Sequence, residues 1–268
     1  MPELPEIYVI ADQMSKTVKG RVVDNCFLMQ EKCLNRPAVY YKNKLSGEKI
    51  EQVIPLGKWL EILFSSNIRL LVNLGMGGEI CFLEKENNAP EKSRFIMKFK
   101  DGTGLYVSFW WFGYIHFVGP DEFHKMTVDL GPDPMEMEFS EFESHVRNSK
   151  GIIKNFLLNQ KKIRGIGNYY AQEIFFRAGV HPLKKIENMS DKELLNLYQS
   201  IKDVFKQSVR MNSSSYEKDF FGRKGLYMTE SMGVGYKAGK PCPKCGTNIE
   251  KIKTGATSHY ICPKCQKL

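Results

Sequence analysis

Along the chain, hydrophobic and polar positions follow a helical pattern, then a strand pattern, then a helical pattern again. Apolar residues recur at helical spacing over residues 2–18 and Gly20 follows, which predicts an opening helix. From about residue 21 to 118, short apolar runs are separated by turn signals such as Asp101-Gly102, with no helices between them. This region predicts an antiparallel sandwich or barrel. The predicted strands include residues 49–56, 58–64, 68–74, 95–100 and 104–110.

A second, helical region follows the segment LGPDPM at residues 130–135, where glycine and prolines break the strand pattern. Two capping boxes ahead of amphipathic stretches predict helix starts. They are Ser140 with Glu143 and Ser190 with Glu193. Two more helices are predicted at residues 152–158 and 168–178, joined by the turn NQKKIRGIGN. Residues 211–240 show little periodicity and predict a long mobile loop.

Composition and charge narrow the class of protein. The chain has 268 residues, of which 42% are hydrophobic and 26% charged, which excludes wholesale disorder. Its net charge of +9 suits a polyanionic partner, although many solvated surfaces are also basic. No apolar run reaches the ~18–20 residues of a membrane span, and MPELPEIYVI has no basic region before its apolar one. We therefore expect a soluble cytoplasmic protein with no membrane partner.

Four of the seven cysteines form a metal-ligand pattern. Cys-x2-Cys-x16-Cys-x2-Cys suits a hairpin that completes one structural zinc site, the alternative being unligated thiols. The candidate ligands are Cys242, Cys245, Cys262 and Cys265. His259 is expected on the hairpin surface, and the scattered Cys26, Cys33 and Cys81 as buried hydrophobes. Such ribbons bind DNA, RNA or protein, so the ligands alone leave the partner open.

The turn between the two middle helices is a candidate phosphate site. Its glycines, Gly165 and Gly167, let backbone N–H groups approach an anion, and Asn168 opens the following helix. Counter-charges for a nucleic-acid backbone are available at Lys154, Lys161, Lys162 and Arg164. The alternative interpretation is a helical hairpin with a solvated loop.

The N-terminus is a candidate nucleophile. Removal of Met1 would expose Pro2 as a secondary amine, which can form a Schiff base because its pKa lies below that of lysine. Glu3 would lie beside it as an acid or base, and Glu6 is one helical turn further on. The alternative is structural, since proline and glutamate are both favoured at a helix start.

Taken together, these motifs resemble the formamidopyrimidine-DNA glycosylase family and its relatives of the endonuclease VIII type. They lie in the family's order and spacing: PELPE (2–6), GKWL (57–60), NLGMGG (73–78), LGPDP (130–134), IRGIGNYYAQE (163–173), FRAGVHP (176–182) and CPKCQK (262–267). The long segment before the zinc ribbon and the stretch KDF (218–220) are similar to the formamidopyrimidine branch. That branch implies oxidised purines, 8-oxoguanine and ring-opened guanine, as substrates.

The resemblance implies an α+β multidomain fold: an N-terminal helix with an antiparallel β-sandwich, then a helical domain with a helix–two-turn–helix element and a zinc-ribbon finger. The implied divisions are 1–130 for the catalytic helix and sandwich, 131–150 for a linker and first helix, 151–238 for the helical DNA-binding domain with its lesion loop, and 239–268 for the finger. It also implies damaged double-stranded DNA in a basic cleft between the two domains. A monomer without a small-molecule cofactor, in a bacterial cytoplasm and associated with the nucleoid, is expected.

By the same resemblance, Pro2 attacks C1′ of a flipped-out nucleotide, Glu3 protonates the sugar, Glu6 supports the site and Lys58 binds the phosphate beside the lesion. Met76 would fill the gap that the flipped base leaves, although Met76 and Trp59 could instead pack in the core. The DNA-contacting positions are expected to be Met76, Trp111, Phe112, Lys154, Lys161, Arg164, Gly167, Asn168, Lys218 and Thr257.

Several positions depart from the family pattern. Trp111 stands where the arginine that enters the duplex is usual, and Ser108 replaces an aspartate. In the finger hairpin Thr257 stands where an arginine is usual, and in an earlier strand Asn73 stands where a histidine is usual. An indole can only stack or donate one hydrogen bond, whereas an arginine can donate two hydrogen bonds to one base or phosphate. We therefore expect an altered preference for the base opposite the lesion.

These departures leave two interpretations. The first is a glycosylase and AP lyase that cleaves the strand by β,δ-elimination through a Pro2 imine, which the retained Pro2, Glu3 and Lys58 favour. The second is a degenerate homologue that binds damaged or abasic DNA with little or no base excision. An intermediate case keeps lyase activity on abasic sites only.

Overall fold

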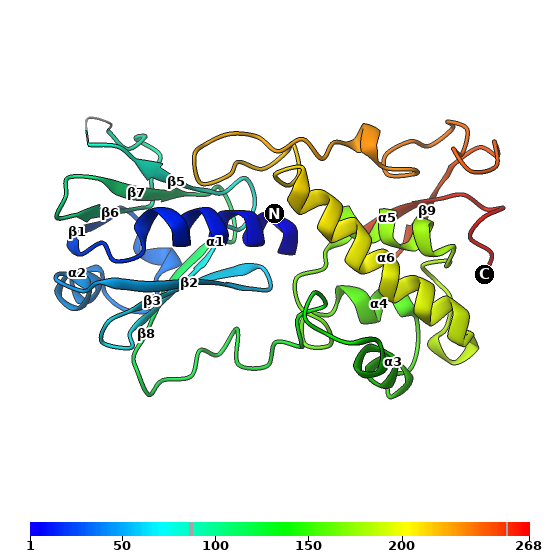
Figure 1. Cartoon of the computed structure of the whole chain (residues 1–268), viewed down its shortest axis with the longest axis horizontal. Helices are drawn as coiled ribbons and strands as arrows, with labels where there is room; N and C mark the ends of the chain where they lie inside the picture. The colour runs from blue at the N-terminus through cyan, green and yellow to red at the C-terminus, as the bar shows by residue number, and fades with distance from the viewer. Residues whose placement is uncertain (86–87, 256) are drawn as a thin grey trace. The chain divides into compact units, whose positions relative to one another are not determined.

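The computed structural model describes residues 1–85, 88–255 and 257–268. The chain forms two compact units (Figure 1): unit 1 is Met1–Val128 with Met211–Leu226, and unit 2 is Asp129–Arg210 with Tyr227–Leu268. The segment 211–226 thus packs with the N-terminal unit, whereas the sequence division grouped it with the helical domain. Within the described ranges, no helix combines the length and apolar composition needed to cross a membrane.

Unit 1 joins one long helix to two antiparallel sheets (Figure 1). Helix α1 (Leu4–Val18) buries its apolar side and packs mainly against β2. One sheet has the order β1-β6-β7-β5 and the other β2-β3-β4-β8. The strands are β1 (Val23–Leu28), β2 (Ile50–Leu56), β3 (Trp59–Phe64), β4 (Arg69–Asn73), β5 (Glu79–Leu83), β6 (Phe95–Phe99), β7 (Gly104–Ser108) and β8 (Tyr114–Val118). The predicted antiparallel β region is confirmed.

One prediction for this region is wrong, because helical elements do lie among the strands. The 3-10 turn η1 (Glu31–Cys33) and helix α2 (Ala38–Leu45) stand between β1 and β2. Helix α2 buries only Tyr41 and Leu45, one turn apart, so its sequence AVYYKNKL carries too short an apolar stripe to stand out as periodic. Cys26, Cys33 and Cys81 are buried as predicted.

Unit 2 is helical and ends in a small hairpin. Its helices are α3 (Phe139–Arg147), α4 (Ile153–Leu158), α5 (Asn168–Ala178) and α6 (Asp191–Arg210), with 3-10 turns η2 (Ile186–Asn188) and η3 (Thr229–Ser231). The antiparallel hairpin is β9 (Glu250–Thr254) with β10 (Thr257–Ile261). Helix α5 packs against α6 and also against β10, so it links the helical core to the hairpin (Figure 1). The whole is the α+β architecture that the sequence predicted.

The two predicted capping boxes have different outcomes. Ser190 caps α6, because its hydroxyl accepts from the Glu193 N–H at 3.3 Å while Glu193 Oε2 accepts from the Ser190 N–H at 2.9 Å. Ser140 was wrong as a cap: α3 starts earlier, with Glu138 at the N-cap position and Ser140 inside the first turn. Phe139 is the first residue of α3, and its ring packs against Tyr198 of α6 at 5.5 Å between centroids, a tertiary contact that the local sequence does not show.

We expect Ser190→Ala to lower the free energy of unfolding by about 1 kcal/mol, because one orphan helix N–H loses its partner. Ser140→Ala is the matched control and should leave stability unchanged, since its hydroxyl has no capping role at that helix position. Urea unfolding followed by circular dichroism measures both. Equal effects of the two substitutions would contradict the assigned helix start.

Candidate functional site

In unit 1, the N-terminus of α1 brings two carboxylates next to Pro2. Glu3 is the N-cap residue, and its N–H donates to Glu6 Oε2 at 2.8 Å in a reciprocal capping box. The other Glu6 oxygen accepts from the Ser214 N–H at 3.1 Å. Pro2, Glu3 and Glu6 are all buried. The helix start and the segment 211–226 therefore hold these groups in one fixed arrangement.

The chain terminus itself is paired within the same unit. The Met1 ammonium lies 3.1 Å from Glu217 Oε1, and the Glu217 side chain is only 14% exposed. Glu79 forms an ion pair with Lys218 at 2.6 Å. This hydrogen bond raises the pKa of Lys218. The structure thus adds Glu217 to the residues around the amine, which sequence analysis did not single out.

Segment 211–226 is pinned to unit 1 through Asp219. The buried carboxylate accepts from Gln13 Nε2 at 3.1 Å and from Asn212 Nδ2 at 2.9 Å. Burial alone would raise the pKa of Asp219, but these hydrogen bonds, with those from Arg223, lower it below its ordinary value. Phe220, which belongs to the segment, is fully buried in the apolar core of unit 1. A segment that the sequence predicted as loop therefore has defined anchors.

Lys58 lies in the tight turn between β2 and β3, half-buried. Its carbonyl accepts from Asn73 Nδ2 at 2.9 Å, and Asn73 Oδ1 accepts from the Gly75 N–H at 3.0 Å. The asparagine that departs from the family pattern thus ties the Lys58 turn to the NLGMGG turn. Trp59 packs in the core, only 5% exposed, whereas Met76 is 52% exposed and does not.

Met76 lies beside the segment that carries the unusual tryptophan. The Met76 N–H donates to the Trp111 carbonyl at 2.9 Å, and the Trp110 N–H donates to the Met76 carbonyl at 3.2 Å. Met76 and Trp111 therefore form an isolated antiparallel β-bridge. Phe112 follows with a left-handed backbone, φ 57°, that points the chain into a sharp turn. The structure brings these three predicted DNA-contacting residues together.

In unit 2, the turn before α5 has the predicted form. Gly167 is the N-cap residue and Asn168 the first residue of α5. Lys161 pairs with Asp129 at 2.8 Å, and Arg164 lies 3.4 Å from the buried Asp133. The Asn168 amide donates to the Ser258 carbonyl at 3.4 Å, which links the helix start to the hairpin.

Lys154 also joins the hairpin. It is 3% exposed, and its ammonium donates to the Thr254 carbonyl at 2.7 Å, to the Thr254 hydroxyl, and to Thr257 Oγ1 at 2.7 Å. Burial lowers the pKa of Lys154. The charge expected at a phosphate is therefore directed at Thr257, the hairpin position where the resemblance led us to expect an arginine.

His259 was wrongly expected on the hairpin surface. It is 1% exposed, and its ring packs against Phe175 of α5 at 5.9 Å between centroids. Burial, with Lys154 nearby, lowers the pKa of His259 to about 4, so the ring is neutral at neutral pH. The reason is that β10 turns this side of the hairpin onto α5.

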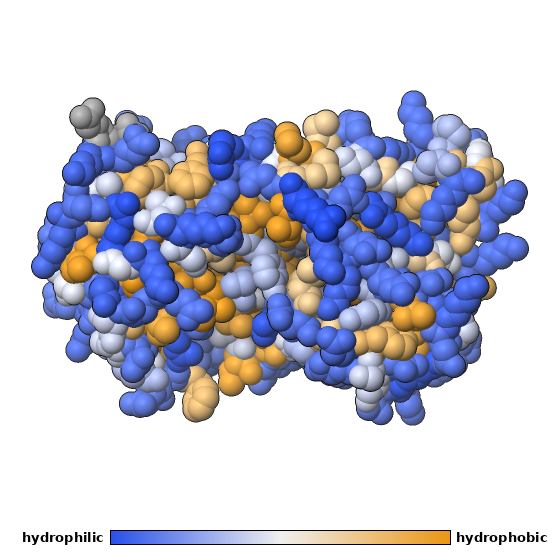
Figure 2. Space-filling view, in the orientation of Figure 1, coloured by the Kyte–Doolittle hydropathy of each residue, from blue (hydrophilic) through white to orange (hydrophobic). Residues whose placement is uncertain are grey.

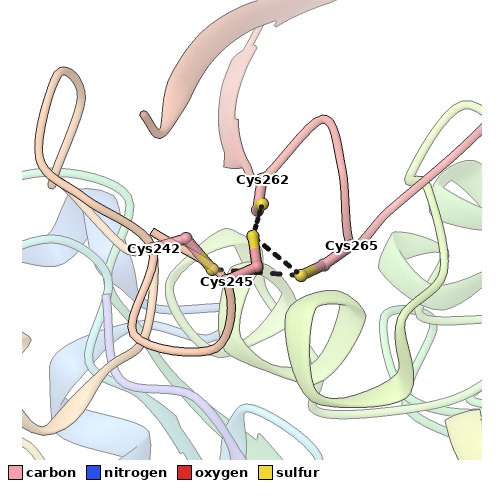
Figure 3. Close-up of side chains that lie close together, drawn as sticks. All are labelled: Cys242, Cys245, Cys262 and Cys265. Carbon is pink, nitrogen blue, oxygen red and sulfur yellow. Dashed lines mark hydrogen bonds between the residues drawn. The ribbon is translucent and has the colours of Figure 1, made fainter. Parts of the chain in front are cut away.

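The four clustered cysteines form a metal centre (Figure 3). Their ligand atoms all lie within 4.8 Å of one another, and three Sγ–Sγ separations are 3.4, 3.5 and 4.0 Å. Zinc bound to four thiolates at about 2.3 Å in a tetrahedron gives sulfur–sulfur edges of about 3.8 Å. The cluster fits one structural zinc ion, and four protein ligands leave no coordination position open for chemistry.

Comparisons with known proteins agree over the whole chain. Residues 1–109 match the formamidopyrimidine-DNA glycosylase N-terminal domain, and residues 130–219 match the formamidopyrimidine-DNA glycosylase H2TH domain. Residues 239–268 match the zinc finger found in FPG and IleRS. Relatives named formamidopyrimidine-DNA glycosylase include one from Solibacter usitatus, 31% identical over 269 residues, and one from Listeria innocua, 32% identical over 277 residues. Both alignments cover all of each chain.

Solved structures give the same result. The Lactococcus lactis Fpg in complex with abasic-site DNA has a TM-score of 0.89 at 25% identity, covering 99% of this chain and 100% of that one. MutM in complex with DNA containing carbocyclic 8-oxo-G has a TM-score of 0.89 at 26% identity, covering 100% of both chains.

Proposed function

Because the chain belongs to the formamidopyrimidine-DNA glycosylase family, a family of glycosylases that act on damaged DNA, we propose that it excises oxidised purines and cleaves the abasic strand through Pro2. The observation that carries this proposal is the arrangement at the start of α1, where Glu3 and Glu6 are buried beside Pro2. Two carboxylates held next to one amine suit a reaction that needs a nucleophile and a proton donor.

The proposed reaction starts when Met1 has been removed and the damaged nucleotide has left the base stack. The lone pair of the Pro2 nitrogen attacks C1′, a carbon–nitrogen bond forms, and the bond from C1′ to the base breaks with its electron pair leaving on the base. The Pro2 nitrogen then loses its proton, and the departing base takes up one proton, so the base leaves as a neutral molecule. Glu3 delivers a proton to the sugar ring oxygen as the ring opens to the iminium. Loss of a C2′ proton then expels the 3′ phosphate, and a second elimination expels the 5′ phosphate.

In this proposal, further residues bind the DNA backbone around the lesion. Lys58, Lys161, Arg164 and the Gly167–Asn168 helix start would contact phosphates, and Lys218 would lie beside the lesion. Lys154 acts through the hairpin: its buried ammonium positions Thr257, which faces the phosphate with a hydroxyl instead of a guanidinium. The preference for 8-oxoguanine and ring-opened guanine rests on the KDF stretch and the long segment before the finger.

A second candidate is a homologue that binds damaged or abasic DNA without excising bases. Two observations favour it, namely Trp111 in place of the duplex-entering arginine and Thr257 in place of the finger arginine. Both losses remove fork-shaped contacts that help to hold a strained, flipped nucleotide.

Borohydride trapping separates the candidates, because it reduces a protein–DNA imine to a stable covalent adduct. We expect adducts on duplexes that carry 8-oxoguanine, ring-opened guanine or an abasic site, and fewer on an oxidised pyrimidine. An undamaged duplex is the control. Adducts on the abasic duplex alone would assign a lyase without base excision, and no adduct on any duplex would overturn the enzymatic proposal in favour of the binding one.

A further inference from the structure

We propose that Met76, Trp110, Trp111 and Phe112, here called the aromatic wedge, stack on the base opposite the lesion without reading its hydrogen-bonding edge. The substrate class is then damaged DNA whose lesion lies opposite any base, or opposite no base at all. This inference rests on the DNA binding of the proposed function, but it does not require that the bound lesion be excised.

The wedge is exposed and apolar. Its members are 52% (Met76), 75% (Trp110), 66% (Trp111) and 66% (Phe112) exposed, in a protein whose visible surface is mostly hydrophilic (Figure 2). Four large apolar side chains that gather at one exposed tip, instead of packing in the core, lose burial free energy unless a partner covers them. A flat nucleobase is a partner that covers indole rings well.

The wedge is also rigid. The Met76 backbone is held by two hydrogen bonds, one to the Trp111 carbonyl at 2.9 Å and one from the Trp110 N–H at 3.2 Å. Glycines make this close approach possible: a Cβ on Gly75 would lie 2.2 Å from the Trp111 carbonyl oxygen. The Trp110 ring covers Gly77, where a Cβ would lie 3.2 Å from the indole. The wedge is therefore formed before DNA binds.

The chemistry of the wedge explains the lack of base reading. A protein discriminates between bases when its hydrogen-bond donors and acceptors match those on the base edge, as when an arginine donates two hydrogen bonds to one base. Trp110 and Trp111 each offer a single indole N–H, and the side chains of Met76 and Phe112 offer no N–H or O–H donor. The nearby Arg94 donates its Nε–H to the Phe109 carbonyl at 3.5 Å, so this guanidinium is directed at the backbone of the residue that precedes Trp110. Stacking, which every base supports, is the interaction that remains.

The natural tryptophans provide a direct probe. The chain has three, and Trp59 is only 5% exposed, so a fluorescence change on DNA binding reports on Trp110 and Trp111. Binding is measured to five duplexes that carry a tetrahydrofuran abasic analogue opposite A, C, G, T or a second tetrahydrofuran. We expect dissociation constants within about threefold of one another, because stacking tolerates every base, together with quenched fluorescence in all five complexes.

Trp111→Arg places a side chain with two parallel N–H donors at this position. We expect this variant to bind the duplex with one particular base opposite the abasic analogue about tenfold or more tightly than the others, and to lose part of the fluorescence quenching. Trp111→Ala should weaken binding to all five duplexes alike. Phe123→Ala is the matched control, because Phe123 is an 87% exposed aromatic of unit 1 outside the wedge; it should change neither affinity nor quenching. Each variant's unfolding temperature confirms that it is folded.

Two results would overturn the inference: a preference of tenfold or more for one opposite base in the unmodified protein, or binding without any tryptophan quenching. Failure of the proposed function looks different. In that case the five duplexes bind alike and quench the tryptophans, yet an 8-oxoguanine duplex yields no borohydride adduct.

Discussion

A protein whose Pro2 nitrogen is blocked by an N-terminal tag is expected to bind abasic DNA normally and to form no covalent adduct with it. An amide nitrogen has no free lone pair for attack on C1′, so imine formation and strand cleavage should fall by at least about a thousandfold, as when other enzymes lose their nucleophile. Nicking of an abasic duplex and borohydride trapping measure the loss, with mass spectrometry to establish which N-terminus each preparation carries.

The structure makes binding a meaningful control for this experiment. Helix α1 begins at Leu4, and its capping box uses the Glu3 and Glu6 side chains, so a tag ahead of Pro2 leaves these contacts in place. The ion pair between the Met1 ammonium and Glu217 is displaced by the tag and is also lost when Met1 is removed, so it does not distinguish the two preparations. The same tag placed at the C-terminus should leave nicking intact, and proteolytic removal that exposes Pro2 should restore it. Equal nicking by blocked and unblocked protein would assign the nucleophile to another amine.

Glu3 can be separated from Pro2 in the same assay. Glu3→Gln keeps the size and the N-cap oxygen but removes the titratable proton. If Glu3 protonates the sugar ring, this variant should lose base excision while an abasic site, whose base is already gone, is still trapped. The comparison distinguishes a damaged helix start, which would weaken every reaction alike, from the loss of one proton donor.

Local signals in the sequence predicted what local chemistry determines. Asn168 opens α5 as expected, because the glycine before it favours an N-cap conformation and the apolar spacing after it is helical. The four cysteines gather as their spacing requires. Both features depend on residues close together in the chain, where spacing and propensity carry most of the information.

Contacts between distant segments were beyond such signals. The hydrogen bond from Ser214 to Glu6 joins residues 208 positions apart, and Glu217 meets the chain terminus through the same segment. A serine-rich stretch without periodicity gives no hint that one N–H will reach a carboxylate of α1. His259 was misjudged for a related reason: a two-stranded ribbon has two faces, and which of them packs on α5 is decided by tertiary contacts.

Within unit 2, the zinc site and Lys154 together explain how so small a hairpin keeps a defined shape. The finger's apolar core consists of few buried residues, namely Phe176, Val234, Cys242, Ile249 and Cys262. A core of this size supplies little stability, so metal ligation has to supply the rest. The Lys154 ammonium then fixes the strand ends by its bonds to Thr254 and Thr257.

Removal of the zinc is therefore expected to unfold the finger and to weaken DNA binding at least about tenfold, since structural zinc contributes on the order of 10 kcal/mol to the folding of such modules. Cys262→Ser should have the same effect as chelation, because a serine hydroxyl is a poor zinc ligand. Hydrogen exchange of the β9 and β10 amides reports unfolding, metal analysis counts zinc per chain, and fluorescence anisotropy measures the affinity for abasic DNA.

Cys33→Ser is the matched control for this substitution. Cys33 is also buried, but it lies in unit 1 and its thiol donates to the Gln30 carbonyl at 3.0 Å, a hydrogen bond that a serine hydroxyl can keep. This variant should retain one zinc per chain and the protection of β9 and β10. If Cys262→Ser kept the metal and the affinity for DNA, the zinc would not be what orders the finger, and the Lys154 contacts with Thr254 and Thr257 would have to hold the hairpin without it.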